Sequence, residues 1–192
     1  MISARDDDRL TDTEMIAMTV ALGLTGPQTT ASFIGNGILA LLTHPEQLVL
    51  LRNKPDLMPR AVDEMLRWAG STQVVPRVRY AAEDVQFDEV TVRKGDALWL
   101  VRAGANHDPR KFDEPDRLDI TREPDRRAEA HIAFGGGSHR CLGAAQASQD
   151  AEVAFETLFR RFPNLTLAVD PNKLEHEHMA FRYRLKTLPV RL

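Results

Sequence analysis

Residues 134–143 read Phe-Gly-Gly-Gly-Ser-His-Arg-Cys-Leu-Gly, and they surround the only cysteine of the chain, Cys141, with glycine and with cationic or titratable side chains. Glycine permits positive φ angles and leaves no side chain in the way of a flat ligand. His139 and Arg140 lie beside the sulfur, and an apolar helical pattern begins just after the cysteine. Nearby positive charge and a helix N-terminus both favour a thiolate. The stretch therefore predicts a loop that presents a thiolate.

Two plainer interpretations of the same stretch compete with this one. A single cysteine is most often a small buried hydrophobe, which needs no special loop. A phosphate-binding loop fits worse, because the stretch lacks a Gly-Lys-Ser/Thr ending and its glycines do not follow the Gly-x-Gly-x-x-Gly spacing.

The pattern Phe-Gly-x-Gly-x-His-x-Cys-Leu-Gly resembles the haem-binding loop of the cytochrome P450 family, in which the cysteine is the axial ligand of the haem iron. The matching residues are Phe134, Gly135, Gly137, His139, Cys141 and Gly143. The resemblance implies haem b (iron protoporphyrin IX) as the cofactor and Cys141 as the metal ligand. A thiolate ligand on haem favours cleavage of the O–O bond.

Composition sets limits on the class of protein. At 192 residues and 43% hydrophobic, the chain can form one large domain. The resemblance implies that this is a single partial domain over residues 1–192, the C-terminal region of the family. The net charge of −3 argues against a nucleic-acid partner. A lone cysteine allows no internal disulfide, and the acidic N-terminus does not read as a signal peptide. A cytoplasmic protein is the expectation.

An uncharged segment at 15–43 is long enough to span a bilayer. It contains Pro27, Gln28 and Asn36, together with several threonines and glycines. A helix buried inside a protein fits this composition better than a transmembrane helix, so we predict no membrane span.

The same segment carries clear helix signals. Thr11-Asp12-Thr13-Glu14 reads as a capping box, and His44-Pro45 predicts the end of the helix near Thr43. Pro27 removes an amide donor in the middle of this helix, which predicts a kink or a widened turn.

The remaining chain alternates between helical patterns and short strand patterns. Further helices are predicted at 46–52, at 59–70 and from Cys141 to Pro163, with a helical turn at 102–106; strands are predicted at 73–80, 85–87, 90–92, 97–101, 165–169, 181–185 and 189–192; residues 108–130 read as a long irregular segment. This order is mainly α with small β-sheets (α+β). It resembles the C-terminal half of the cytochrome P450 fold, with a long central helix, an ExxR helix, a meander, the Cys loop and a final long helix, and without the N-terminal half.

Glu64 and Arg67 are spaced to pair on one face of the predicted helix at 59–70. Taken alone, such a pair is an ordinary surface ion pair that contributes little. The resemblance makes it the Glu-x-x-Arg signature of the family, with Arg117 as the third member of a buried network. The implied role is structural: the network holds the meander against the helix.

Haem carries two propionates, which require cationic partners. The resemblance assigns one contact to Arg79, which the following residues favour over Arg77, and a second contact to His139. Each side chain could instead be a solvated charge.

On the oxygen side, Thr25-Gly26-Pro27-Gln28-Thr29-Thr30 resembles the family's oxygen-handling segment. Gly26 would make room for dioxygen, and Thr29 would steady it together with a water. The family's acid is replaced by Gln28, whose amide can orient a water but cannot pass a proton as a carboxylate does. We therefore expect less efficient proton delivery and leakage of peroxide.

The resemblance implies a haem-thiolate monooxygenase that inserts one oxygen atom from dioxygen into a small lipophilic substrate. Its electrons would come from a ferredoxin-type donor, with Arg140 as a plausible contact. The alternative is a truncated, non-catalytic haem-binding remnant, or one half that needs a separate N-terminal part. A third hypothesis is a redox-sensing thiol protein without haem, which leaves four residues unexplained: Glu64, Arg67, Arg117 and Thr29.

Overall fold

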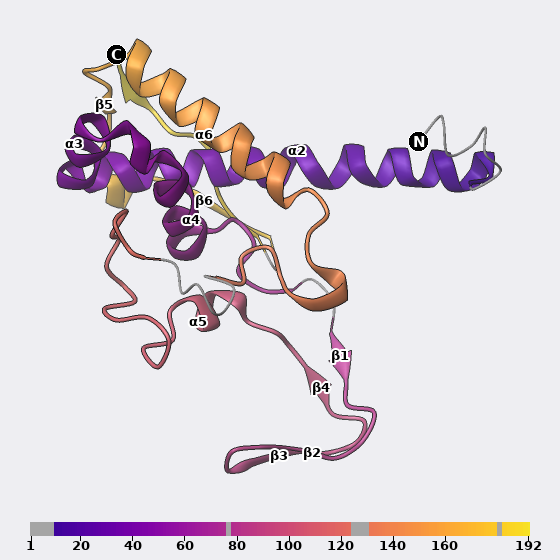
Figure 1. Cartoon of the computed structure of the whole chain (residues 1–192). Coiled ribbons are helices and arrows are strands. Elements are labelled where there is room, and N and C mark those ends of the chain that lie inside the picture. Colours follow the sequence, from indigo (N-terminus) through magenta and orange to yellow (C-terminus); the bar gives the residue numbers. More distant parts are fainter. Residues whose placement is uncertain (1–9, 76–77, 124–130, 180–181) are drawn as a thin grey trace.

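The computed structural model describes residues 10–75, 78–123, 131–179 and 182–192. Its longest element is α2 (Asp12–Thr43), which crosses the whole molecule in Figure 1. The predicted capping box starts this helix: Thr11 Oγ1 accepts a hydrogen bond from the Glu14 amide at 3.2 Å, and the Glu14 carboxylate accepts one from the Thr11 amide at 2.8 Å. The predicted start and end of the helix are confirmed.

Pro27 does not interrupt α2. The segment is α-helical on both sides of the proline without a widened turn, and α2 is one continuous helix in Figure 1. The predicted widened turn is therefore wrong. Proline deprives the Gly23 carbonyl of its usual amide partner, but Gly23 is exposed, so water can satisfy that carbonyl without distortion of the helix.

The hydrophobic core lies around the C-terminal half of α2. Four further helices pack around this core: α3 (Pro45–Asn53), the short 3₁₀ helix η1 (Pro55–Leu57), α4 (Met58–Ala69) and α6 (Ala144–Arg161). Fully buried side chains from these helices include Leu41, Val62, Met65 and Phe155. α6 crosses α2 obliquely in Figure 1, and α4 lies below α2 in this view.

Two residues of α2 explain how closely its neighbours approach. A Cβ atom on Gly37 would lie 2.5 Å from Cζ of Phe155, so only glycine lets α6 pack at this distance. The Asn36 amide donates hydrogen bonds to the Ala69 carbonyl at the end of α4 (3.2 Å) and to the Tyr183 carbonyl (3.1 Å). Asn36, a polar residue in this uncharged segment, thus connects α2 to the end of α4 and to the strand that contains Tyr183.

The N-terminal half of α2 is exposed rather than buried. Its exposed large hydrophobic side chains are Ile16, Met18, Val20, Leu22 and Leu24. The expectation of a helix buried along its whole length is therefore wrong for this half. Within the part of the chain that the structure describes, no helix is long and apolar enough to cross a membrane.

The described strands form four small antiparallel sheets. They pair β1 (Arg79–Tyr80) with β4 (Ala97–Leu98), β2 (Val85–Phe87) with β3 (Val90–Val92), β5 (Thr166–Leu167) with β8 (Val190–Arg191), and β6 (His176–Met179) with β7 (Arg182–Leu185). Short helices α5 (Arg102–Asn106), η2 (Gly137–His139) and η3 (Pro171–Lys173) complete the fold. The β2–β3 hairpin projects away from the helices in Figure 1. The prediction of a mainly helical fold with small sheets is confirmed.

Candidate functional site

The loop before α6 has the backbone that its glycines predict. Gly135 and Gly137 have φ angles of +74° and +64°, values that side chains rarely tolerate. The Cys141 amide donates a hydrogen bond of 2.8 Å to the Phe134 carbonyl, which closes the loop on itself. Between these two residues the chain makes the single turn of η2, which ends at His139.

Cys141 is exposed, which rules out the interpretation of a small buried hydrophobe. Its sulfur lies beside the N-terminus of α6, because a Cβ atom on the N-cap residue Gly143 would lie 4.0 Å from it. A helix N-terminus stabilises negative charge, so this position suits a thiolate. The loop thus presents the sulfur outward at the positive end of the final long helix.

A cavity of about 560 Å³ lies between this loop and α2. It is lined by Cys141 and His139 from the loop and by Gly26 and Thr29 from α2, residues more than a hundred positions apart in the sequence. Its remaining walls are mostly apolar, with Phe134 contributed by the loop. The structure therefore brings the predicted cysteine loop and the predicted oxygen-side segment to one cavity.

The Thr29 hydroxyl is held by the helix itself. It donates toward the Thr25 carbonyl at 2.9 Å and the Gly26 carbonyl at 3.1 Å. Its two lone pairs leave the oxygen able to accept a hydrogen bond from a molecule in the cavity.

Two predicted residues lie elsewhere. Gln28 is exposed and is not one of the described residues that line the cavity. Arg79 is exposed on β1, where its backbone position pairs with Leu98, and it does not line the cavity either. Arg77, the less favoured alternative to Arg79, lies outside the described residues.

The cavity contains a cation that the sequence did not single out. Arg102, at the start of α5, lines the cavity, and its Nη1 donates a hydrogen bond of 2.8 Å to the Ala133 carbonyl at the base of the loop. Burial lowers the pKa of this guanidinium, and the charge of Cys141 opposes the shift. The available signal was weak: a single positive charge directly after the apolar run Leu98-Trp99-Leu100-Val101.

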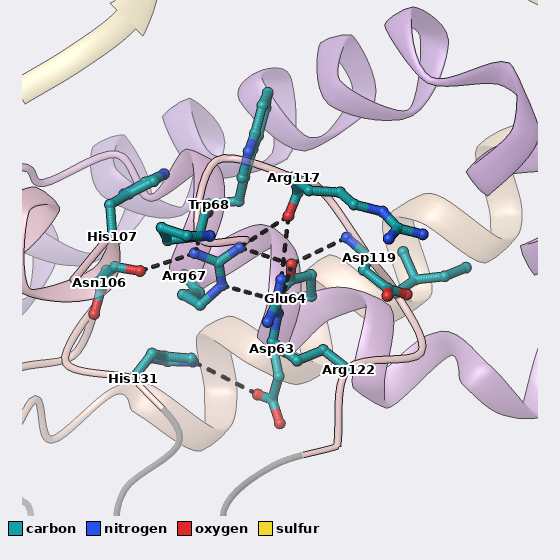
Figure 2. Close-up of polar contacts among 12 residues, drawn as sticks. Asp63, Glu64, Arg67, Trp68, Asn106, His107, Arg117, Asp119, Arg122 and His131 are labelled. Atoms are coloured by element: carbon teal, nitrogen blue, oxygen red, sulfur yellow. Dashed lines mark hydrogen bonds and ion pairs between the residues drawn. The ribbon is translucent and has the colours of Figure 1, made fainter. Parts of the chain in front are cut away.

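On α4, Glu64 and Arg67 form a buried ion pair, as Figure 2 shows. Arg67 Nε and Nη2 donate to the two Glu64 carboxylate oxygens at 2.7 and 2.8 Å. The side chains are only 3% and 2% exposed, so each charge depends on the other. Arg67 also donates to the carbonyls of Asn106 and Pro115, both at 2.8 Å. The pair thus fastens the irregular segment after α5 to α4.

The third member of this network is Arg122 rather than Arg117. Arg122 Nε lies 3.2 Å from both Glu64 carboxylate oxygens. The Arg117 guanidinium points away from Glu64 in Figure 2 and pairs with Glu114 at 2.9 Å, with 59% of its side chain exposed. Only the Arg117 carbonyl joins the network, as an acceptor from Arg67 at 3.2 Å. The turn that aims this carbonyl inward carries the Arg117 side chain outward.

Comparisons with known proteins agree with this geometry. Residues 50–187 match the family model of cytochrome P450. The chain is 41% identical to cytochrome P450 107B1 of Saccharopolyspora erythraea, over 98% of this chain and 45% of that protein. It is 42% identical to the vitamin D(3) 25-hydroxylase of Pseudonocardia autotrophica, over 98% of this chain and 46% of that protein.

A solved structure is similar along nearly the whole chain. The cytochrome P450 hydroxylase LnmA from the leinamycin biosynthetic pathway of Streptomyces atroolivaceus is 45% identical with a TM-score of 0.87, over 97% of this chain and 47% of that one. The chain thus spans about half the length of the relatives it matches. On its sequence, fold and cysteine loop, the chain belongs to the cytochrome P450 family.

Proposed function

We propose that this chain forms the haem-thiolate site of a monooxygenase that inserts one oxygen atom from dioxygen into a small lipophilic substrate. The observation that carries the proposal is the shared cavity. It joins Cys141, at the N-terminus of α6, to Gly26 and Thr29 on α2. These are the two sides of an oxygen-activating site, and the chain folds them onto one space.

The cavity residues fit haem b chemically. A thiolate suits iron as a soft ligand, and the exposed Cys141 sulfur is free of covering side chains at the helix N-terminus. Phe134 and Leu142 give apolar walls for a flat macrocycle, and His139 gives a donor for a propionate at its edge. The Gly135 backbone, with its positive φ, keeps side-chain bulk out of the loop.

The chain's own residues would share three tasks. Bound haem would supply electron transfer and O–O cleavage, which the thiolate ligand favours. Gly26 leaves space on the α2 side of the cavity because it has no side chain. Thr29 keeps its hydroxyl pointed along the helix backbone and can accept a hydrogen bond from a water in the cavity. The apolar walls suit a lipophilic substrate and exclude bulk water.

A ferredoxin-type protein is the electron donor that we propose. Arg140 is exposed next to the cysteine, on the loop that would cover one face of the haem. A cation there would attract an acidic partner and raise its rate of association. Arg140→Glu should slow reduction by a ferredoxin at low salt, whereas reduction by dithionite should stay unchanged.

A second candidate function is a haem-binding half that needs a further polypeptide part to turn over. The exposed apolar side chains on the N-terminal half of α2, among them Val20 and Leu24, favour it. An apolar patch of this kind marks a surface that another segment covers.

Isotopic labelling distinguishes the two candidates. The haem-loaded chain is supplied with a ferredoxin, its reductase and labelled dioxygen, and is tested on a panel of lipophilic compounds. Products with one labelled oxygen atom would support the monooxygenase. Thiolate-ligated haem without any labelled product would support the second candidate.

A further inference from the structure

Arg102 lies at the edge of the cavity with part of its donor capacity unused. Its Nη1 is committed to the Ala133 carbonyl at 2.8 Å, while its Nε is buried and has no hydrogen-bond partner among the described residues. A guanidinium offers five N–H donors in a fixed fork, and a buried donor without a partner is costly. The unsatisfied Nε therefore indicates that a ligand atom completes this site.

The charge of the cavity specifies the ligand. Arg102 and His139 both line it, and the described lining residues include no aspartate or glutamate. Burial already disfavours the charged form of Arg102, as its lowered pKa indicates. Arg102 is a half-buried cation whose cavity lining offers it the charge of Cys141 but no carboxylate, so the site suits an anionic ligand, and the guanidinium fork matches a carboxylate best.

The position of Arg102 specifies which carboxylate. Its bond to Ala133 fixes the guanidinium at the base of the loop whose other end is Cys141, and the Phe134 carbonyl next to it receives the Cys141 amide. Arg102 and His139 line the same cavity as Cys141, so a cofactor held by that sulfur would have both side chains within its cavity. Arg79, which the sequence suggested for this task, is exposed on β1.

We propose that Arg102 is a cofactor-binding residue whose guanidinium binds a haem propionate at the edge of the cavity. The proposal rests on the haem-thiolate function proposed above and names a residue for it. One propionate would then bond to Arg102 and to His139 or a water, and the bond to Ala133 would hold the guanidinium ready before haem arrives.

The competing role for Arg102 is purely structural. Its bond to Ala133 alone could keep α5 and the loop together, in which case a substitution would weaken the binding of any flat ligand equally. Haem and its dimethyl ester separate the two roles, because esterification removes the propionate charges and leaves the macrocycle and iron unchanged.

The experiment measures dissociation constants of the purified chain for haem and for haem dimethyl ester, delivered in the same dilute detergent. We expect the wild type to prefer haem. Arg102→Gln should reduce that preference by roughly tenfold to a hundredfold, the equivalent of one charge-assisted hydrogen bond. Arg102→Lys should retain part of the preference. Arg160→Gln, at an exposed position on α6, should leave it unchanged.

The possible outcomes distinguish the role of Arg102 from the haem-thiolate function. A thiolate absorption signature together with a preference that Arg102→Gln leaves intact would overturn the role of Arg102 and leave the haem-thiolate function standing. A wild type without any preference for haem over the ester would overturn it as well. Absence of the thiolate signature in the wild type would overturn both proposals.

Discussion

At Glu64, one buried carboxylate serves two arginines and the amide of Asp119, which donates to it at 3.0 Å. Arg67 comes from the same helix, whereas Arg122 comes from the irregular segment after α5. The carboxylate therefore joins a helix to a segment that has little regular structure of its own. Such a network holds only when its members are paired, since an isolated buried charge is costly.

Two substitutions in that segment test which arginine belongs to the network. Arg122→Gln removes a charge-assisted hydrogen bond to Glu64 and should lower the free energy of unfolding by about 1–3 kcal/mol. Arg117→Gln removes only an exposed pair with Glu114 and should change it by less than about 0.5 kcal/mol. Urea denaturation followed by circular dichroism gives both values. A larger effect at Arg117 than at Arg122 would contradict the geometry.

The sequence located part of this network and missed the rest. Glu64 and Arg67 could be predicted because a helical period sets their relative position. Arg117 and Arg122 follow Pro115 in a segment without periodicity, so nothing in the sequence says which side chain turns back toward α4. The resemblance favoured Arg117, and the backbone turn decided for Arg122.

Gln28 is exposed outside the cavity but directly precedes Thr29, which lines it, so position 28 carries a prediction about proton supply through water to Thr29. In the haem-loaded chain with an electron donor, Gln28→Glu should lower the peroxide released per electron consumed, because a carboxylate can pass a proton where an amide can only orient a water. Peroxide and reductant consumption are measured together. Gln146→Glu, on the exposed part of α6, serves as the control. Unchanged peroxide release in Gln28→Glu would refute the prediction.

Among the elements, the contact of α2 with α6 depends on one glycine. The missing side chain of Gly37 makes room for the Phe155 ring, which also meets Phe33 edge-on with centroids 6.1 Å apart. Gly23 lies on the same helix with nothing within 4 Å of its would-be Cβ. The two positions therefore separate the need for close packing from the general cost of glycine in a helix.

Alanine substitutions at these glycines should have opposite signs. Gly37→Ala should lower the free energy of unfolding by about 1–3 kcal/mol, because Phe155 is fully buried and cannot move aside without repacking the core. Gly23→Ala should raise it by roughly 0.5–1 kcal/mol, the gain of alanine over glycine in a helix. Thermal and urea denaturation both report the difference. Stabilisation by Gly37→Ala would mean that α6 is packed less closely than described.

A turn after α5 carries a pH dependence. The Arg110 guanidinium and amide hold the Asp108 carboxylate at 2.7–3.1 Å, and they lower the pKa of Asp108 from its ordinary 3.8 to about 2. A lowered carboxyl pKa stabilises the fold above the ordinary value, and that stabilisation is lost as the pH falls through about 2. NMR titration of the Asp108 carboxyl carbon should show this low midpoint. In Arg110→Gln it should move up toward 3.8, and an unchanged midpoint would contradict the assignment.

Helices could be predicted from the sequence far better than strands. The capping box at Thr11 and the proline at 45 gave the bounds of α2, because such signals are local. Among the described residues of the strand predicted over 73–80, Arg79–Tyr80 form a strand and Val74 makes an isolated bridge with Val101. Strand β6 (His176–Met179) was missed altogether, since its polar residues become a strand only by pairing with β7.

At the scale of the whole molecule, the three parts of α2 have different surroundings. Its C-terminal half carries the core, its middle lines the cavity, and its N-terminal half leaves Ile16 and Leu24 exposed. We expect this apolar surface to bind a hydrophobic dye. Replacing Ile16 and Leu24 together by lysine should reduce dye binding and self-association without lowering the helix content. Unchanged fluorescence in the double variant would contradict this expectation.

The cavity itself was only half predictable. The cysteine loop is a local motif, so Cys141, Gly135 and Gly137 could be read from ten consecutive residues. Arg102 enters the same cavity through a long-range bond to Ala133, which no spacing in the sequence announces. The resemblance supplied Gly26 and Thr29 by position, and the fold places them on the same cavity as the sulfur.

We propose that the Cys141 thiolate would hold haem iron in this cavity. The most direct test is the absorption spectrum of the haem-loaded chain, reduced and treated with carbon monoxide, for the wild type and for Cys141→Ala and Cys141→His. We expect a red-shifted Soret band in the wild type and its loss in both variants, with a band typical of imidazole ligation in Cys141→His. The same red-shifted band in Cys141→Ala would show that the Cys141 sulfur is not the ligand of the haem iron.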